Sequence, residues 1–231
     1  KQGGTALIEA ATAGNVTVVV SLLEKGADPL LTDNDKVTPL MSAASQGHAE
    51  VCRLLLARGV DVNHVANSGG TALMFAAGGG HLEAAQLLLA HGADVNVAVL
   101  ATPEYIEQVA KSVAEGKEDV EPHKDGVTAL SLAAQGGHLE LVRALVAARA
   151  AVDVSDEEDE TPLLAAFKNK HYNVSYFLLE HGANPNDAFV DDKKKTHSLL
   201  LDSVQLGNVP LASLLVRRGA NLSVSDEEGV T

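Results

Sequence analysis

Cysteine is almost missing from this sequence: Cys52 is the single thiol among 231 residues. One cysteine excludes an internal disulfide framework, and this usage gives no sign of an oxidising compartment. Cys52 lies on the apolar face of a predicted helix, where a free cysteine usually behaves as a small buried hydrophobe. We expect that role for it, and a reactive thiol is the alternative interpretation.

Basic residues and long apolar runs are also scarce. The chain has 17 Lys and Arg against 31 Asp and Glu, which gives a formal net charge of −14. This charge would repel nucleic-acid phosphates, so we expect no nucleic-acid partner. No apolar run reaches the length of about 18 residues that a membrane span requires, and no signal peptide is recognisable. We therefore expect no direct membrane span and an intracellular location, cytoplasmic by default, with an organelle stroma as the alternative.

Aromatic residues make up only 3% of the chain, although 46% of it is hydrophobic. This balance favours a core of alanine and leucine between thin, closely stacked helices. One group of aromatic residues at helical spacing stands out against it: Phe167, Tyr172, Tyr176 and Phe177. Such spacing is more typical of a core than of a site, so we expect these side chains to be buried.

An internal repeat is the strongest signal in the sequence. A hydroxyl residue that can cap a helix recurs every 33 residues, with 24 residues added to one interval and 4 to another. The capping residues are Thr5, Thr38, Thr71, Thr128, Thr161, Ser198 and Thr231. In the same phase, a glycine recurs where a second helix would end in the left-handed conformation: Gly26, Gly59, Gly92, Gly182 and Gly219. Each period therefore predicts a helix, a turn, a second helix and a stop.

Residues 71–96, TALMFAAGGGHLEAAQLLLAHGADVN, show the repeat most clearly. The pattern resembles the T-P-L…A-A…G-H…L-L…G-A-D-V-N pattern of the ankyrin-repeat family over nearly the whole chain. It departs from the family after T-P-L, where the family has histidine and this chain has residues such as Met41 and Leu164. The resemblance implies an all-α solenoid of paired antiparallel helices, with β-hairpin or loop fingers beside a concave groove. We expect one domain over 1–231 with repeats at 5–37, 38–70, 71–127, 128–160, 161–197 and 198–230.

Both chain ends fall inside this period. Lys1 begins partway through a predicted hairpin, and Thr231 is the first residue of a further repeat. We therefore expect the sequence to be a fragment or a processed chain.

The longest interval between caps contains an insert at about 98–121 with helix signals of its own. Thr102 can cap a helix whose first residue is Pro103. Tyr105, Ile106 and Val109 then recur at helical spacing and predict an apolar stripe. Two interpretations stay open: the insert folds back on the array and buries the stripe, or the stripe contacts a partner.

Three successive fingers alternate in charge. The charged residues are Asp156, Glu157 and Glu158, then Lys193, Lys194 and Lys195, then Asp226, Glu227 and Glu228. One interpretation is a set of solvated tips that attract one another weakly. The other is a charged rim that selects a partner, because complementary charge governs specificity and encounter rate.

Neither the histidines nor the glycines of the chain indicate catalysis. His48, His81, His138 and His171 occupy one place in different repeats. Such places lie about 10 Å apart along a stack and cannot converge on a metal ion, whose ligands lie about 2 Å from it. The glycine run 78–80 lacks the preceding strand and the lysine of a phosphate-binding loop. We expect no enzymatic activity, no cofactor and no metal.

Two residues stand where other repeats have glycine. Arg149 occupies a helix-stop position, and Lys170 occupies the turn between two paired helices. A left-handed conformation would cost each about 1 kcal/mol. We therefore expect the weakest joint of the array between its fourth and fifth repeats.

The resemblance implies a protein-interaction scaffold or adaptor that binds through its concave face and its acidic fingers. The expected partner is a protein with a basic or mixed-charge surface. Two alternatives stay open: a regulatory or tethering segment of a larger enzyme or channel, and a structural subunit of a stable assembly. A ligand cannot be named from the scaffold, because the same fold carries many surfaces.

Overall fold

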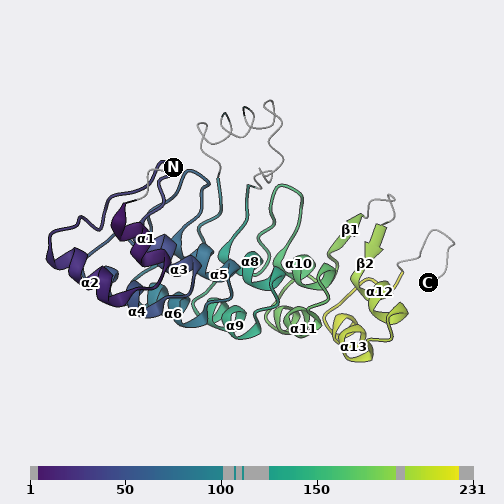
Figure 1. Ribbon diagram of the computed structural model, residues 1–231. Coiled ribbons are helices and arrows are strands. Elements are labelled where there is room, and N and C mark those ends of the chain that lie inside the picture. The colour runs from purple at the N-terminus through teal and green to yellow at the C-terminus, as the bar shows by residue number, and fades with distance from the viewer. Residues whose placement is uncertain (1–4, 101–106, 108–110, 112–124, 191–195, 224–231) are drawn as a thin grey trace.

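The computed structural model describes residues 5–100, 107, 111, 125–190 and 196–223. Helices in antiparallel pairs stack in chain order into one elongated array (Figure 1). The first helices of the pairs are α1 (Ala6–Thr12), α3 (Pro39–Ser45), α5 (Ala72–Gly78), α8 (Ala129–Gln135), α10 (Pro162–Lys168) and α12 (Leu199–Gln205). The second helices are α2 (Val16–Glu24), α4 (Ala49–Leu56), α6 (Leu82–Ala90), α9 (Leu139–Ala147), α11 (Tyr172–Glu180) and α13 (Val209–Arg217). The predicted helical solenoid is confirmed, whereas the residues that divide one repeat from the next stay a prediction.

Each first helix begins at the hydroxyl residue that the repeat predicted as its cap. The Thr5 side chain accepts a hydrogen bond from the backbone N–H of Ile8 at 3.2 Å, and Thr38 and Thr161 cap their helices in the same way. α3 and α10 also have proline as their first helical residue, where the missing N–H is harmless and the ring presets φ. Local chemistry thus sets where each helix pair begins.

The core consists mainly of small residues between first helices and leucines behind them. Alanines that are 0% exposed include Ala11, Ala43, Ala44, Ala76, Ala77, Ala133 and Ala134. Small side chains let neighbouring helices approach closely, and Leu40, Leu73 and Leu130 fill the space behind them at 1% exposure each. The expected alanine and leucine core is confirmed.

The turn between paired helices places a histidine against a glycine of the preceding pair. Gly47 has φ +73°, and a Cβ atom there would lie 2.4 Å from Nδ1 of His81. His81 Nε2 lies 3.0 Å from the carbonyl oxygen of Ser45, so the ring also links the two pairs by a hydrogen bond. These histidines are packing residues, and no group of side chains able to hold a metal ion occurs in the described part of the chain.

The fingers lie at one side of the array, beside the first helices (Figure 1). The last of them contains β1 (Ala188–Val190) and β2 (Thr196–Ser198), which pair antiparallel with Phe189 opposite His197. Neighbouring fingers are joined by backbone bonds, such as that from Asn67 N–H to the Asp35 carbonyl at 2.9 Å. The predicted β-hairpin and loop fingers are confirmed.

The insert leaves the array at a finger. Val99 N–H donates to the Val127 carbonyl at 2.8 Å, and Ala98 and Thr128 form an antiparallel bridge. Between residues 100 and 125 the structure describes only Glu107 and Lys111, which are helical and exposed. Tyr105, Ile106 and Val109 lie outside the described residues, so the two interpretations of their stripe stay predictions. None of the helices described is long and apolar enough to cross a bilayer.

Candidate protein-interaction surface

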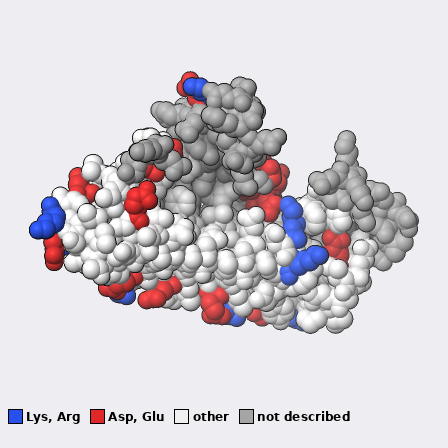
Figure 2. All heavy atoms as spheres, viewed as in Figure 1, with Lys and Arg blue, Asp and Glu red and all other residues white. Residues whose placement is uncertain are grey.

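Charge is unevenly distributed over the face shown in Figure 2. Acidic groups are spread along the array, whereas basic groups gather mainly at its left end and in the region of α10 and α12. Lys168 is the last residue of α10, and Lys170 lies in the turn that follows it. The acidic finger before α10 and the junction between α10 and α12 are therefore the candidate interaction surfaces.

The backbone of the acidic finger at 156–160 is held in place by its own side chains. Asp156 Oδ1 accepts hydrogen bonds from the N–H groups of Glu158 and Glu160, each at 2.9 Å. Glu157 N–H donates to the carbonyl of Asp125 in the preceding finger at 3.0 Å. Glu157 and Glu158 are exposed, while Asp156 is half-buried and stabilises the turn. Of the predicted contact residues here, the two glutamates are therefore exposed on a hydrogen-bonded loop, and their contact with a partner stays a prediction.

The other charged fingers cannot be compared with this one. Lys193, Lys194 and Lys195 lie outside the described residues, as do Asp226, Glu227 and Glu228. The structure therefore brings together Asp156, Glu157 and Glu158 only. Alternation of charge along the rim stays a prediction.

A cleft separates α10 from α12, although first helices elsewhere pack directly on one another. Phe167 stands six residues after its cap, where the preceding pairs have Ala11, Ala44, Ala77 and Ala134. Those alanines are 0% exposed and allow close helix contact. A phenylalanine cannot fit in the same space, and it holds the next helix away. The result is a cleft of about 320 Å³ between the last two helix pairs.

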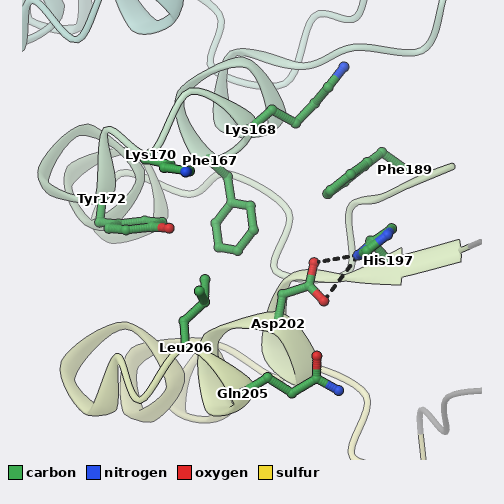
Figure 3. Close-up of a pocket in the computed structure, with 9 residues that line it drawn as sticks. All are labelled: Phe167, Lys168, Lys170, Tyr172, Phe189, His197, Asp202, Gln205 and Leu206. Carbon is green, nitrogen blue, oxygen red and sulfur yellow. Dashed lines mark hydrogen bonds and ion pairs between the residues drawn. The ribbon is translucent and has the colours of Figure 1, made fainter. Parts of the chain in front are cut away.

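Figure 3 shows how the cleft is lined. The Phe167 ring points toward its middle, with Tyr172, Leu206 and Lys170 on one side and Phe189, His197 and Asp202 on the other. Phe167 and Tyr172 meet edge to face with 5.6 Å between ring centroids. Leu206 is 59% exposed, so the cleft offers apolar surface to a ligand.

The far side of the cleft is fixed by a side-chain pair and a ring stack. His197 Nδ1 lies 2.9 Å from Asp202 Oδ2, and the His197 ring stacks on Phe189 with 4.8 Å between centroids. Lys168 Nζ lies 5.8 Å from the centroid of Phe189 and 2.5 Å from Oε2 of Glu160. This wall is therefore preorganised, and Lys168 is already engaged.

The turn that carries Lys170 adopts the left-handed conformation, with φ +64°. Five other pairs have glycine at this place: Gly14, Gly47, Gly80, Gly137 and Gly207. The pair that follows Lys170 has Asn208 where the four preceding pairs have histidine, and Asn208 instead caps its own helix by accepting from Leu211 N–H at 3.3 Å. The absence of a histidine ring leaves room for the lysine Cβ. Arg149 is also left-handed, with φ +68°, so the expected conformation is confirmed at both positions.

The predicted burial of the four aromatic residues is confirmed for two of them. Phe167 is 5% exposed and Phe177 is 6% exposed. Tyr172 and Tyr176 are only half-buried. Phe167 and Tyr172 also line the cleft, which the sequence did not predict. Comparing the repeats in register could have revealed it, since Phe167 replaces an alanine.

Two titratable groups near or within the array have perturbed pKa values. Burial raises the pKa of the Cys52 thiol to about 12, and Cys52 is 0% exposed. The expected burial of Cys52 is confirmed, and a raised pKa disfavours the reactive thiolate. Burial also raises the pKa of Asp187, next to β1, although hydrogen bonds from Thr161 and Asn184 oppose the shift. Thr161 Oγ1 donates to Asp187 Oδ2 at 2.6 Å, so this carboxyl group ties the last finger to the cap of α10.

Comparison with known proteins places these features in a family. A family model described as ankyrin repeats in three copies matches residues 7–99 and again 100–189. The crystal structure of the human ASB11 ankyrin repeat domain superposes with a TM-score of 0.73 and covers 99% of this chain and 90% of that one. At 24% sequence identity, that likeness shows the fold alone.

Curated relatives are similar over part of their length. The mouse B-cell lymphoma 3 protein homolog is 32% identical over 122 residues, which is 52% of this chain and 26% of that protein. The ankyrin repeat and KH domain-containing protein mask-1 of Caenorhabditis elegans is 36% identical over 103 residues, which is 44% of this chain and 4% of that protein. The matched segments thus span about a quarter or less of these relatives.

Proposed function

Because the chain belongs to the ankyrin-repeat family, we propose that it is a scaffold or adaptor that holds a partner protein against its concave face and fingers. Ankyrin repeats bind other proteins and generally do not catalyse reactions. The partner that fits best carries a basic or mixed-charge surface, since the chain has a formal net charge of −14. This charge would accelerate the approach of a basic surface.

One observation supports this proposal most strongly: the acidic finger at 156–160 is preformed. Asp156 closes the turn by two hydrogen bonds of 2.9 Å, and Glu157 is tied through its backbone to Asp125. A loop that is already ordered loses little conformational entropy on binding, so its charges contribute to recognition at low cost. Glu157 and Glu158 are exposed side chains of this loop, and we expect them to face basic groups of a partner.

The test begins with affinity capture of partners from the native source and identification by mass spectrometry. The association rate of the captured partner is then measured with the double variant Glu157→Lys and Glu158→Lys. We expect association to slow by roughly tenfold at low salt, because complementary charge acts mainly on the encounter rate. The difference should shrink as salt is added.

A matched control separates the finger from the total charge. The double variant Glu24→Lys and Glu180→Lys changes the net charge equally, but both residues are exposed at the ends of second helices, α2 and α11. We expect a much smaller effect on the association rate. Equal slowing by both double variants would mean that net charge, and not the finger, directs the partner.

The lengths of the relatives favour a second candidate function, a regulatory or tethering segment within a larger enzyme or channel. This chain covers 26% of the mouse relative and 4% of the nematode relative, so similar arrays occur inside much longer proteins. An antibody against this array would then detect, in the native source, a protein far larger than 231 residues. A band at the size of the array itself would favour a free-standing adaptor or a structural subunit.

A further inference from the structure

The junction between α10 and α12 combines a left-handed lysine, an apolar cleft and the bulky ring of Phe167. Lys170 is held in a left-handed conformation that glycine adopts more easily, with φ +64°. Strained residues of this kind collect at functional sites. The cleft beside it has about 320 Å³ of space and apolar walls. At no other helix junction does the sequence combine a wedge, meaning a bulky ring such as Phe167 in place of alanine, with a lysine in the turn.

The two lysines of the cleft differ in their partners. Lys168 Nζ lies 2.5 Å from Glu160 Oε2, so its charge is balanced. The backbone N–H of Lys170 donates to the Phe167 carbonyl at 2.9 Å, but its side chain makes no ion pair or hydrogen bond with any residue that the structure describes. Lys170 lines the same cleft as Phe167 and Tyr172 (Figure 3), in a chain whose charge is otherwise strongly negative. Lys170 is exposed, so its ammonium group is hydrated and can exchange water for the carboxylate of a ligand that also contacts the apolar wall.

The size of the cleft limits that ligand. Pockets for small ligands usually measure about 300–1,000 Å³, and this cleft lies at the lower end of that range. It can accept one side chain, not an extended molecule. Phe167, Tyr172 and Leu206 offer the surface for such a side chain, and Lys170 stands at the edge where a neighbouring carboxylate would lie.

We propose that the cleft between α10 and α12 binds a peptide segment of a partner protein in which an apolar side chain adjoins a carboxylate. The apolar side chain lies between Phe167, Tyr172 and Leu206, and the carboxylate accepts hydrogen bonds from Lys170 Nζ. The proposal goes beyond the function proposed above and does not depend on the acidic finger. Together the two sites fit a partner of mixed charge, with basic residues at the finger and an acidic, apolar segment at the cleft.

Short peptides test this binding without knowledge of the partner. The probe is acetyl-Gly-Asp-Phe-Gly-amide, titrated to about 10 mM into isotopically labelled protein, which saturates a site with a millimolar dissociation constant. Amide shifts should change at 167–172 and 204–206. Two control peptides replace Asp by Asn or Phe by Ala, and each should bind about threefold or more weakly.

The variant Lys170→Gly removes the ammonium group and restores the residue that the other pairs have at this turn. It should fold at least as stably as the parent chain and bind the probe about threefold more weakly, as expected for loss of one partly exposed charge pair. Arg149→Gly is the matched control, because it also removes a cation from a left-handed position but does not line the cleft. It should leave binding unchanged.

Several results would overturn the proposal. These are no saturable shifts up to the highest concentration, shifts that map outside the cleft, equal binding of the Asn peptide, and equal weakening by Lys170→Gly and Arg149→Gly. None of them bears on the acidic finger, whose test uses the association rate of a captured partner. Failure of one site can therefore be distinguished from failure of the other.

Discussion

Two junctions of the array, α3 with α5 and α10 with α12, are built on the same plan and differ in outcome. At the first, Ala44 is 0% exposed, and Gly47 accommodates the His81 ring. At the second, the corresponding residues are Phe167, Lys170 and Asn208, and a cleft of about 320 Å³ lies between the helices. The packed junction and the junction with the cleft thus differ at three corresponding positions. A repeat scaffold can gain a local site without a change of fold, because each unit contacts mainly its neighbours.

The largest effect is expected when a bulky ring like that of Phe167 is introduced into a packed junction. Ala44→Phe should lower the free energy of unfolding by about 3 kcal/mol, since a large ring at a 0% exposed position forces its neighbours apart. Val204→Phe is the control at the equivalent place of the last pair, where the side chain is 61% exposed, and it should change stability by less than about 0.5 kcal/mol. Chemical denaturation followed by circular dichroism measures both. Equal stabilities would mean that the packed junctions tolerate a wedge and that Phe167 does not open the cleft.

The features that the sequence predicted well are local ones. Capping residues such as Thr5 and Thr38 act within three residues, and a stop glycine such as Gly92 acts on its own backbone. Their recurrence at a fixed period was enough to predict the helix pairs and their stacking. The alanine and leucine core followed from the composition, which is 46% hydrophobic but only 3% aromatic.

The cleft was not predicted, because it depends on residues of two different pairs. Phe167 has helical spacing with its aromatic neighbours and resembles core when one pair is considered alone. Only its alignment with Ala44 and with the pair after it shows that the ring has no room to pack as alanine does. Lys170 was predicted as a strained residue, but the room for its side chain depends on Asn208, which stands where the preceding pairs have histidine.

A smaller effect on stability is expected at Arg149, whose backbone is left-handed like that of Lys170 but which lies outside the cleft. Its carbonyl accepts from Asn96 Nδ2 at 3.3 Å, as the Gly92 carbonyl accepts from Asn63 Nδ2 at 3.1 Å. Arg149→Gly keeps this backbone bond and should raise the free energy of unfolding by about 1 kcal/mol.

Amide exchange provides the regional measurement for the same variant. Residues 145–172 should exchange faster than α3 and α5 in the parent chain, as expected for a weak joint between the fourth and fifth repeats. Arg149→Gly should slow that exchange. A less stable glycine variant, or uniform exchange along the array, would show that this joint is not weak and would leave the α10–α12 junction as the main irregularity.

The smallest predicted effect concerns pH and the carboxyl group that anchors the last finger. Burial raises the pKa of Asp187 above its ordinary value of 3.8, so the folded chain binds this proton more tightly than the unfolded chain does. Its contribution to stability is therefore present at low pH and is lost as pH rises through the folded pKa. Relative to the parent chain, Asp187→Asn should gain stability between about pH 4 and pH 7.

Only the change with pH tests this prediction, because the substitution also alters the hydrogen bonds to Thr161 and Asn184 by an amount that does not depend on pH. Unfolding free energies of both proteins at several pH values give the difference directly. A difference that is flat or falls with rising pH would contradict a raised pKa at Asp187.

The central claim, that a partner lies against the fingers and the first helices, is tested most directly by amide exchange of the array with and without its captured partner. We predict protection at 156–160 and in the first helices near it, α8 and α10, with little change in the second helices from α2 to α13. Protection confined to the second helices, with no change at 156–160, would contradict the claim.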